Sequence, residues 1–280
     1  MALIEVNTVN NAFHRLIERS IFKNNVGRFA TEFQRHGGEV FGCRLHHLAA
    51  HRRAAGEEQV AAYEVNTEFV AGNTDDTDNS GILRYVEILN SGITMEQDKE
   101  INGLSLVGVG SGTTIDNVTV RRSDDDGIEI WGGTVDLSNC TVEYCTDDQF
   151  DIDDGYSGTV TNLTINQHTD GNAGIEMSGT TAATFIGLTL TQNYSDKEGA
   201  IFFKKDGIGG HFIDCEIIDN VDDGMTIYSQ GDADEANISF EFVSITSPDT
   251  ATNFTDSDSG GSAADIESIF DAEIVTKTFS

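Results

Sequence analysis

Pairs of aspartates recur along the chain, and each pair stands one residue ahead of a short alternation of apolar residues. The pairs are Asp125–Asp126, Asp147–Asp148 and Asp222–Asp223. Carboxylate oxygens are the ligands that Ca²⁺ prefers, and paired carboxyl groups also carry out acid–base chemistry on sugars. An aspartate in a turn has a simpler role too, because its side chain accepts hydrogen bonds from backbone N–H groups. A calcium site would draw its ligands from Asp125, Asp126, Asp147, Asp148 and Asp153.

The segments that must position these pairs form a repeat. The pattern apolar-x-x-apolar-x-apolar occurs in seven copies, which start at Leu83, Ile115, Leu137, Val160, Phe185, Phe212 and Phe240. Between the copies stands a small residue followed by apolar-x-apolar, as in "GIEI" and "GIEM". No helix fits between such short segments. The repeat therefore predicts an all-β fold, a right-handed parallel β-helix of about seven coils, in which equivalent residues stack about 4.8 Å apart.

Two kinds of residue keep a fixed place in this repeat. Asn117, Asn139 and Asn162 occupy the same position in three successive copies, and we expect their amides to stack at a corner of the coil. Cys140 and Cys215 fall at inward positions, which favours small core residues over redox groups.

A row of carboxylates is expected on one outer face of the coils. Both Ile of "GIEI" point inwards, so Glu129 points outwards. The same position holds Ser105, Glu129, Asp151, Glu176, Phe202 and Thr226 in successive copies. Adjacent charges about 5 Å apart repel by roughly 3 kcal/mol at an effective dielectric near 20. The row should therefore bind a cation, raise a pKa or spread into water.

A second outward row lies two residues further along each segment. It holds Trp131, Asp153, Ser178, Lys204 and Tyr228. Carboxylates beside flat aromatic rings suit a sugar, whose C–H faces stack on the rings while its hydroxyls form hydrogen bonds. We expect Trp131, Glu176 and Tyr228 to contact a polysaccharide or a cell-surface glycan.

The chain resembles the pectate-lyase-like superfamily of right-handed parallel β-helices, and it is similar to secreted bacterial β-helix proteins of unassigned function. The resemblance rests on "DNSGILRYVEI", "INGLSLVGVGSGTTIDNVTV", "DDDGIEIWGGTVDLSN" and "DDQFDIDDGYSGTV". These stretches cover residues 79–166 well, and residues 167–246 follow loosely. The resemblance implies an extracellular or cell-surface location, although the N-terminus lacks the pattern of a signal peptide.

The enzymes of this superfamily carry motifs that the chain lacks. The R-x-P-x-x-R motif of pectate lyases cannot occur, because the only proline is Pro248, and the N-T-D and G-H-G motifs of polygalacturonases are missing. We therefore predict a non-catalytic module that binds glycans, calcium or both. The alternative is a calcium-dependent polysaccharide lyase or a glycoside hydrolase that uses Glu129, Asp151 and Lys204. A second alternative is a purely structural surface or fibre segment.

Charge divides the 280 residues into unequal parts. The chain has a net charge of -32, which disfavours binding to nucleic acid and to anionic membranes, and no apolar run is long enough to span a membrane. Residues 1–62 carry eight basic and six acidic residues and no Asp. We interpret 1–62 as a basic segment, helical cap or non-native, 63–246 as the β-helix and 247–280 as an acidic linker with a C-terminal cap.

Two stretches of the basic segment have the periodicity of short helices, "NNAFHRLIERSIF" and "RLHHLAAHRRAAGEEQVAAY". The second contains His46, His47 and His51, and a metal site on one helix face is one interpretation. No acidic or cysteine partner stands at matching spacing, so a basic helix is the preferred interpretation.

Overall fold

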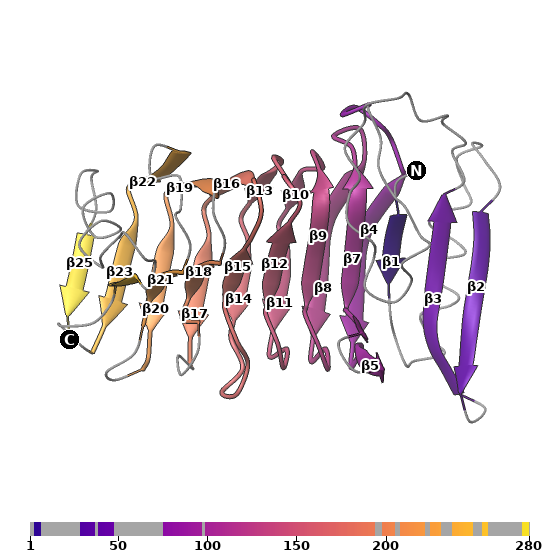
Figure 1. Ribbon diagram of the computed structural model, residues 1–280, viewed down its shortest axis with the longest axis horizontal. Coiled ribbons are helices and arrows are strands. Elements are labelled where there is room, and N and C mark those ends of the chain that lie inside the picture. Colours follow the sequence, from indigo (N-terminus) through magenta and orange to yellow (C-terminus); the bar gives the residue numbers. More distant parts are fainter. Residues whose placement is uncertain are drawn as a thin grey trace.

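A computed structural model of the chain shows an elongated parallel β-solenoid whose coils stack along one axis (Figure 1). The structure describes residues 75–248 apart from 97–98, 194–197, 205–207, 222–224 and 231–236, together with the strands at 3–6, 29–36, 39–47, 254–256 and 276–279. Within this part of the chain, no helix is long and apolar enough to cross a membrane.

One layer of the solenoid, sheet A, contains one strand from each coil, all parallel. In spatial order its coil strands are β7 (Leu104–Val109), β9 (Ile128–Gly133), β12 (Phe150–Asp153), β15 (Ile175–Met177), β18 (Ile201–Phe203), β21 (Ile227–Ser229) and β24 (Phe254–Asp256). Three antiparallel strands extend the sheet beyond β7, namely β1 (Leu3–Val6), β3 (Glu39–His47) and β2 (Phe29–His36).

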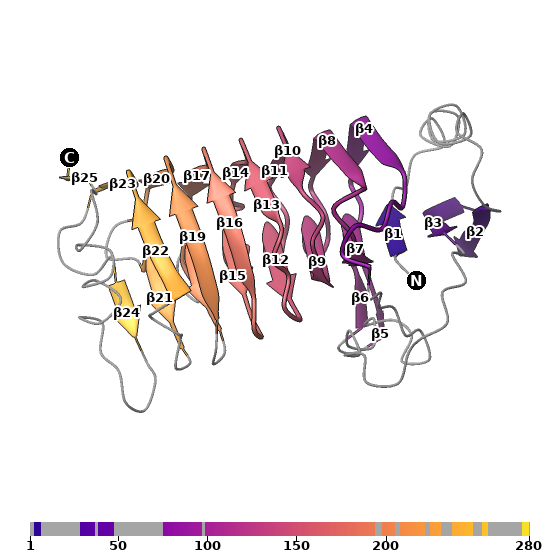
Figure 2. The ribbon, with the colours of Figure 1, turned by 90° about the horizontal axis from the view of Figure 1, so that it is seen from above.

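The opposite layer, sheet B, bends into two arms, and Figure 2 shows it from above as a layer separate from sheet A. The long strands β4 (Ile82–Leu89) and β8 (Thr114–Arg121) run through both arms. Later coils contribute one short strand to each arm. The first arm holds β10 (Leu137–Ser138), β13 (Thr159–Thr161), β16 (Ala182–Ile186), β19 (Gly209–Ile213) and β22 (Ile238–Glu241).

The second arm of sheet B holds β11 (Thr141–Glu143), β14 (Thr164–Asn166), β17 (Thr189–Gln192), β20 (Glu216–Asp219), β23 (Ser244–Ser247) and β25 (Thr276–Phe279). A separate antiparallel hairpin joins β5 (Ile93–Glu96) to β6 (Lys99–Ile101).

In each of the seven described copies of the motif, a residue with positive φ stands at the bend between the two arms. These residues are Tyr85, Asn117, Asn139, Asn162, Gly187, Asp214 and Phe242, with φ between 53° and 70°. One left-handed residue turns the chain while the apolar side chains on both sides of it stay inside, which explains the apolar-x-x-apolar spacing. Asparagine tolerates this conformation better than most residues do.

The expected amide ladder at this bend is confirmed in part. Asn162 donates to the Oδ1 of Asn139 (3.1 Å). Asn139 and Asn117 instead both donate to Asp116 Oδ1, at 2.9 and 2.8 Å, because a carboxylate at the end of the ladder is a stronger acceptor than another amide.

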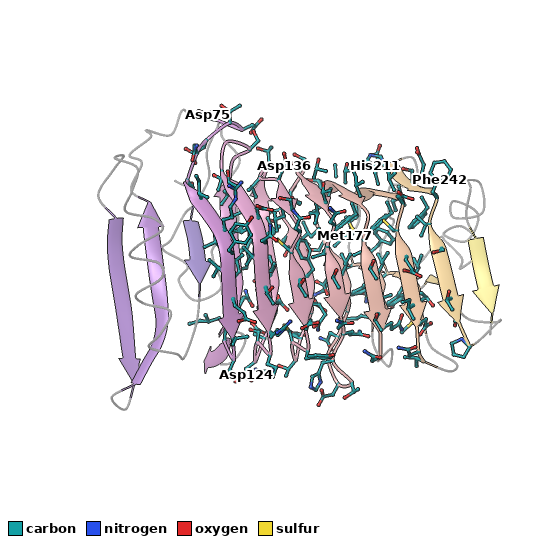
Figure 3. All side chains as sticks on the ribbon, turned by 180° about the vertical axis from the view of Figure 1, so that it is seen from behind. Asp75, Asp124, Asp136, Met177, His211 and Phe242 are labelled. Atoms are coloured by element: carbon teal, nitrogen blue, oxygen red, sulfur yellow. The ribbon has the colours of Figure 1, made fainter. Side chains whose placement is uncertain are left out.

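The core confirms the register of the seven motif copies. Leu83 pairs with Ile115, Ile115 with Leu137, and each later copy pairs with the next through Phe212 and Phe240. Their side chains are buried, and three phenylalanines stack in line, with ring centroids 5.0 Å apart for Phe185–Phe212 and 5.2 Å apart for Phe212–Phe240. Figure 3 shows side chains filling the interior of the described coils.

The cysteine interpretation agrees with this packing. Cys140 and Cys215 are buried, and burial raises the pKa of each thiol to about 11. Thiols with such a high pKa are poor nucleophiles at neutral pH, as expected for small core residues.

Two predictions need correction. The parallel β-helix fold is confirmed, but the solenoid has about five turns, slightly fewer than the seven coils expected. The helix predicted from residue 44 is wrong for residues 44–47, which belong to β3. These residues join sheet A as an edge hairpin, so tertiary pairing overrides the local periodicity. The predicted helix at 10–22, the rest of the second helix and His51 lie outside the described residues.

Candidate acidic cation site

Three carboxylates stand in line on the outer face of sheet A, as expected. Glu129 on β9 pairs with Asp151 on β12, and Asp151 pairs with Glu176 on β15. The row is not open to water, since Glu129, Asp151 and Glu176 are only 3%, 7% and 3% exposed. The option that the charges spread into water is therefore wrong, because neighbouring residues of the fold enclose the row.

The turns ahead of the strands deliver further carboxylates to the same place. Asp126 Oδ1 accepts a hydrogen bond from the backbone N–H of Asp148 (2.9 Å), and Asp148 Oδ1 accepts one from the N–H of Ala173 (2.6 Å). Each aspartate therefore braces the turn of the next coil, which is the turn role considered from the sequence. That role uses one oxygen of each carboxylate and leaves the other for additional contacts.

The glycine between turn and strand is required by close packing. A Cβ at Gly127 would lie 2.2 Å from Val142 Cγ1 and 2.6 Å from the carbonyl oxygen of Gln149. In the following coil Gln149 closes the turn itself, because its Oε1 accepts from Cys145 N–H (2.9 Å) and its Nε2 donates to the Cys145 carbonyl (3.0 Å). The turns that carry the aspartates are thereby fixed.

The row and the turns together form two groups of three carboxylates, the two trios. The first trio is Asp126, Glu129 and Asp151, and the second is Asp148, Asp151 and Glu176. Within each trio, one ligand oxygen from each residue lies within 4.8 Å of the others. Asp151 belongs to both trios, and no hydrogen-bond partner is found for its buried Oδ1.

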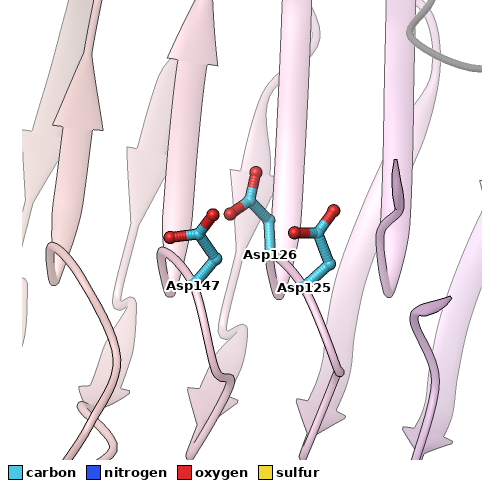
Figure 4. A group of neighbouring side chains, drawn as sticks. All are labelled: Asp125, Asp126 and Asp147. Carbon is cyan, nitrogen blue, oxygen red and sulfur yellow. The ribbon is translucent and has the colours of Figure 1, made fainter. Parts of the chain in front are cut away.

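A third acidic group lies at the edge of the site and includes part of the first. Asp125 and Asp126 come from one turn and Asp147 from the next, and their carboxylates gather at the ends of neighbouring strands (Figure 4). The Asp147 carboxylate accepts a hydrogen bond from the Asn172 amide of the next coil. Asp147 thereby links its turn to the next coil, and the three carboxylates are close enough to hold a metal ion as well.

The electrostatics of the site follow from burial and crowding. Burial raises the pKa of Asp126 well above its ordinary value, and the nearby charges of Glu129 and Asp151 raise it further. The pKa of Asp148 and that of Asp151 are raised for the same reasons, with Glu176 the largest charged contributor to each. Without a bound cation the site therefore holds protons more tightly than exposed carboxylates do.

A family model described as "Pectate-lyase like beta helix domain" matches residues 46–279. The chain belongs to the pectate-lyase-like β-helix domain family. No curated protein and no solved structure gave a significant match.

In this pectate-lyase-like β-helix domain, one basic residue stands beside the second trio. Lys204 follows β18, and its Nζ lies 2.6 Å from Glu176 Oε1. Burial alone would lower the pKa of Lys204, but the carboxylates of Glu176, Asp151 and Asp148 outweigh it and raise the pKa. Lys204 is therefore a permanent cation at neutral pH, which makes it a poor general base.

The aromatic residues expected to face a sugar are arranged differently from the prediction. Trp131 is only 4% exposed, so its ring is not available for stacking on the described surface. Tyr228 is partly exposed and stacks on Phe202 with ring centroids 4.8 Å apart. Asp153 pairs with Trp131 and belongs to none of the acidic groups.

The register of β21 also differs from the prediction. Phe202 pairs with Tyr228, so Tyr228 lies in line with the carboxylate row and Thr226 stands one position before the buried Ile227. The sequence alignment was wrong here by two residues. An alternation with period two places apolar residues inside in either register, so the pattern alone does not detect this shift.

One residue of the site was missed from the sequence. Asn102 stands one residue ahead of Gly103, just as Asp126 stands ahead of Gly127, and its side-chain amide donates to the Glu129 carboxylate. Its equivalence to Asp126 in the repeat is the signal that could have found it. Asn102 and Ser105 close the carboxylate row at one end, and Ala173 and Phe202 close it at the other.

Proposed function

We propose that the chain binds a calcium-class divalent cation on the outer face of sheet A, and that the cation holds the carboxylate or hydroxyl oxygens of a polysaccharide. The observation that carries the proposal is Asp151. Its Oδ1 is buried and lacks a hydrogen-bond partner, and the residue belongs to both trios. A buried acceptor without a partner costs about 1–3 kcal/mol, and a cation would remove that cost.

The ligand set favours calcium among common cations. All three side chains of the first trio offer oxygen, which hard cations prefer. Calcium–oxygen distances of about 2.3–2.6 Å place two ligands of one ion at most about 5 Å apart, and the trio atoms lie within 4.8 Å. Three carboxylates carry more negative charge than one divalent ion neutralises. An acidic sugar would therefore be held only by direct coordination of its oxygens to the ion.

The polysaccharide part of the proposal rests on the family and on one aromatic pair. The pectate-lyase-like family connects the fold with polysaccharides in general. Partly exposed Tyr228, stacked on Phe202 in line with the carboxylate row, offers an aromatic face for a sugar ring. An extracellular or cell-surface location is part of the proposal. Calcium-binding modules in that location have dissociation constants of about 10⁻⁴–10⁻³ M.

Titration calorimetry of the whole chain with CaCl₂ tests the proposal. We expect one saturable site in the wild type and none with Asp151→Asn. The matched control is Asp124→Asn, which removes an equal charge from an exposed residue of the turn that carries Asp126 and should leave binding unchanged. Loss of binding in both variants would point to a diffuse effect of net charge, and no binding in the wild type would reject the cation site.

A second candidate function is cleavage of an acidic polysaccharide at the same face. It is favoured by the Lys204–Glu176 ion pair beside Asp151, because a carboxyl with a raised pKa next to a fixed cation resembles an acid–base pair. Incubation with polygalacturonate would reveal cleavage as new reducing ends, or as ultraviolet absorbance if elimination forms a double bond. If neither cation binding nor cleavage is found, the structural alternative remains.

A further inference from the structure

Successive coils present the same short motif at the bend between the two arms of sheet B. The pattern N-x-S/T, which is the acceptor motif for N-linked sugars, occurs at Asn117, Asn139, Asn162, Asn193, Asn237 and Asn253. The first three of these are bend residues with left-handed φ. After each of these bends the middle residue of the motif is buried and the threonine is half-buried. The fold therefore brings the amide and the hydroxyl of the motif to the surface together.

Asn162 has the most room for a substituent among the three bend asparagines. Its side chain is exposed, and the equivalent position of the next coil holds Gly187, which has no side chain. The three atoms nearest to a Cβ placed at Gly187 all belong to Asn162, and the closest is Oδ1 at 2.9 Å. Asn139 instead lies between two other asparagines of the row, and Asn117 is half-buried. A sugar on Asn162 would extend over the position of Gly187.

The hydrogen bond that Asn162 makes is compatible with such a sugar. A side-chain amide has two N–H groups, and Asn162 uses one of them to donate to Asn139 Oδ1 at 3.1 Å. The sugar donor is an oligosaccharide linked to a lipid phosphate. Its anomeric carbon bonds to Nδ2 while the bond from that carbon to the phosphate oxygen breaks, and the proton lost by the amide goes to the leaving phosphate. One N–H then remains for Asn139.

We infer that Asn162 is a site of N-linked glycosylation. The inference rests on the extracellular or cell-surface location that is part of the proposed function, because sequences of this type are modified in exported proteins. The bend belongs to sheet B, whereas the two trios lie on sheet A in the opposite layer (Figure 2). The glycan therefore leaves the acidic face open and adds a bulky, solubilising group to the bend.

The test secretes the whole chain from a eukaryotic host behind a cleavable export signal. Treatment with peptide-N-glycosidase in heavy-oxygen water converts each glycosylated asparagine into a labelled aspartate, and peptide mass spectrometry locates the label. Thr164→Val removes the hydroxyl of the motif but keeps a β-branched strand residue, and Thr164→Ser keeps the hydroxyl. The matched control is Thr141→Val, which removes the motif of Asn139 in the preceding coil.

We expect the label at Asn162 in the wild type, in Thr164→Ser and in Thr141→Val, and its complete loss in Thr164→Val. A wild type that is unlabelled, or labelled only at other asparagines, would overturn the inference, as would a label at Asn162 that persists in Thr164→Val. Should Thr164→Val fail to be secreted, the wild-type peptides still decide. Calcium titration of the glycosylated chain separates the two claims, because absence of binding there would reject the proposed cation site and leave the glycan at Asn162 in place.

Discussion

Asp126 and Asp148 occupy the same corner of adjacent coils, and the carboxylate of the first accepts a hydrogen bond from the backbone N–H of the second. The same contact repeats from Asp148 to Ala173, where the row of aspartates ends. Turn formation and charge accumulation are thus two results of one contact. Each aspartate that accepts this hydrogen bond also adds a carboxylate to the buried row. The repulsion between carboxylates therefore grows from coil to coil until Ala173 stands in the place of an aspartate.

The first prediction concerns Asp151→Asn in the absence of metal. An amide of the same shape removes one charge from both trios and can donate to the neighbouring carboxylates. We expect the free energy of unfolding in chelator to rise by about 1–3 kcal/mol, measured by urea denaturation. A decrease would show that the carboxylates do not repel one another in the metal-free protein.

The second prediction concerns pH. The raised pKa values of Asp126, Asp148 and Asp151 mean that the folded state binds more protons than the unfolded state above about pH 4. Stability must then fall as the pH rises through this window and must recover on acidification. In chelator we expect a higher melting temperature at pH 5 than at pH 7.5.

Calcium and Asp151→Asn provide the controls for the pH experiment. Saturating calcium should reduce the difference between pH 5 and pH 7.5, because the ion replaces protons as the counter-charge. Asp151→Asn should reduce it as well. An equal difference in all three samples would assign the effect to the general acidity of the surface instead of the buried row.

The third prediction concerns the bend of sheet B. Asn139 has φ 54° and donates to Asp116. Asn139→Ala should lower the free energy of unfolding by about 2 kcal/mol, combining left-handed strain of about 1 kcal/mol with a lost hydrogen bond of similar size. Asn139→Gly should recover the strain component. Equal losses for Ala and Gly in urea denaturation would show that the left-handed conformation carries no cost here.

The fourth prediction concerns the phenylalanine stack. Phe212 is fully buried between Phe185 and Phe240, and Phe212→Ala should cost about 3–5 kcal/mol through lost burial and a cavity. Phe242, which is 57% exposed in the same region, provides the matched control. Phe242→Ala should change stability by less than about 0.5 kcal/mol. Comparable losses in thermal melts of the two variants would contradict the packing described.

The sequence was sufficient to predict the core of the solenoid. Residues such as Leu137 and Val160 repeat with a spacing that only stacked coils can satisfy, and their register is confirmed. The line of Glu129, Asp151 and Glu176 followed from the same spacing. These features depend on the periodicity of one strand and on the stacking of equivalent positions, and both can be read along a single chain.

Other features depend on residues that are distant in sequence. The burial of Glu129 and the pairing of Lys204 with Glu176 require knowledge of which side chains from other coils enclose each position. Tyr228 was assigned to the wrong row because period-two alternation is unchanged by a shift of two residues. The helical periodicity at 44–47 was overridden by strand pairing that joins distant parts of the chain.

The hydrogen bonds between coils run along the axis of the solenoid, and each coil contacts only its neighbours. A pulling force on the two ends should therefore peel the protein coil by coil, with each step opening one interface at a time. An ion bound by residues of two adjacent coils would crosslink those coils across one of these interfaces. Unwinding should then stall at β9 and β12, so that calcium concentration would set the mechanical strength of the middle of the molecule.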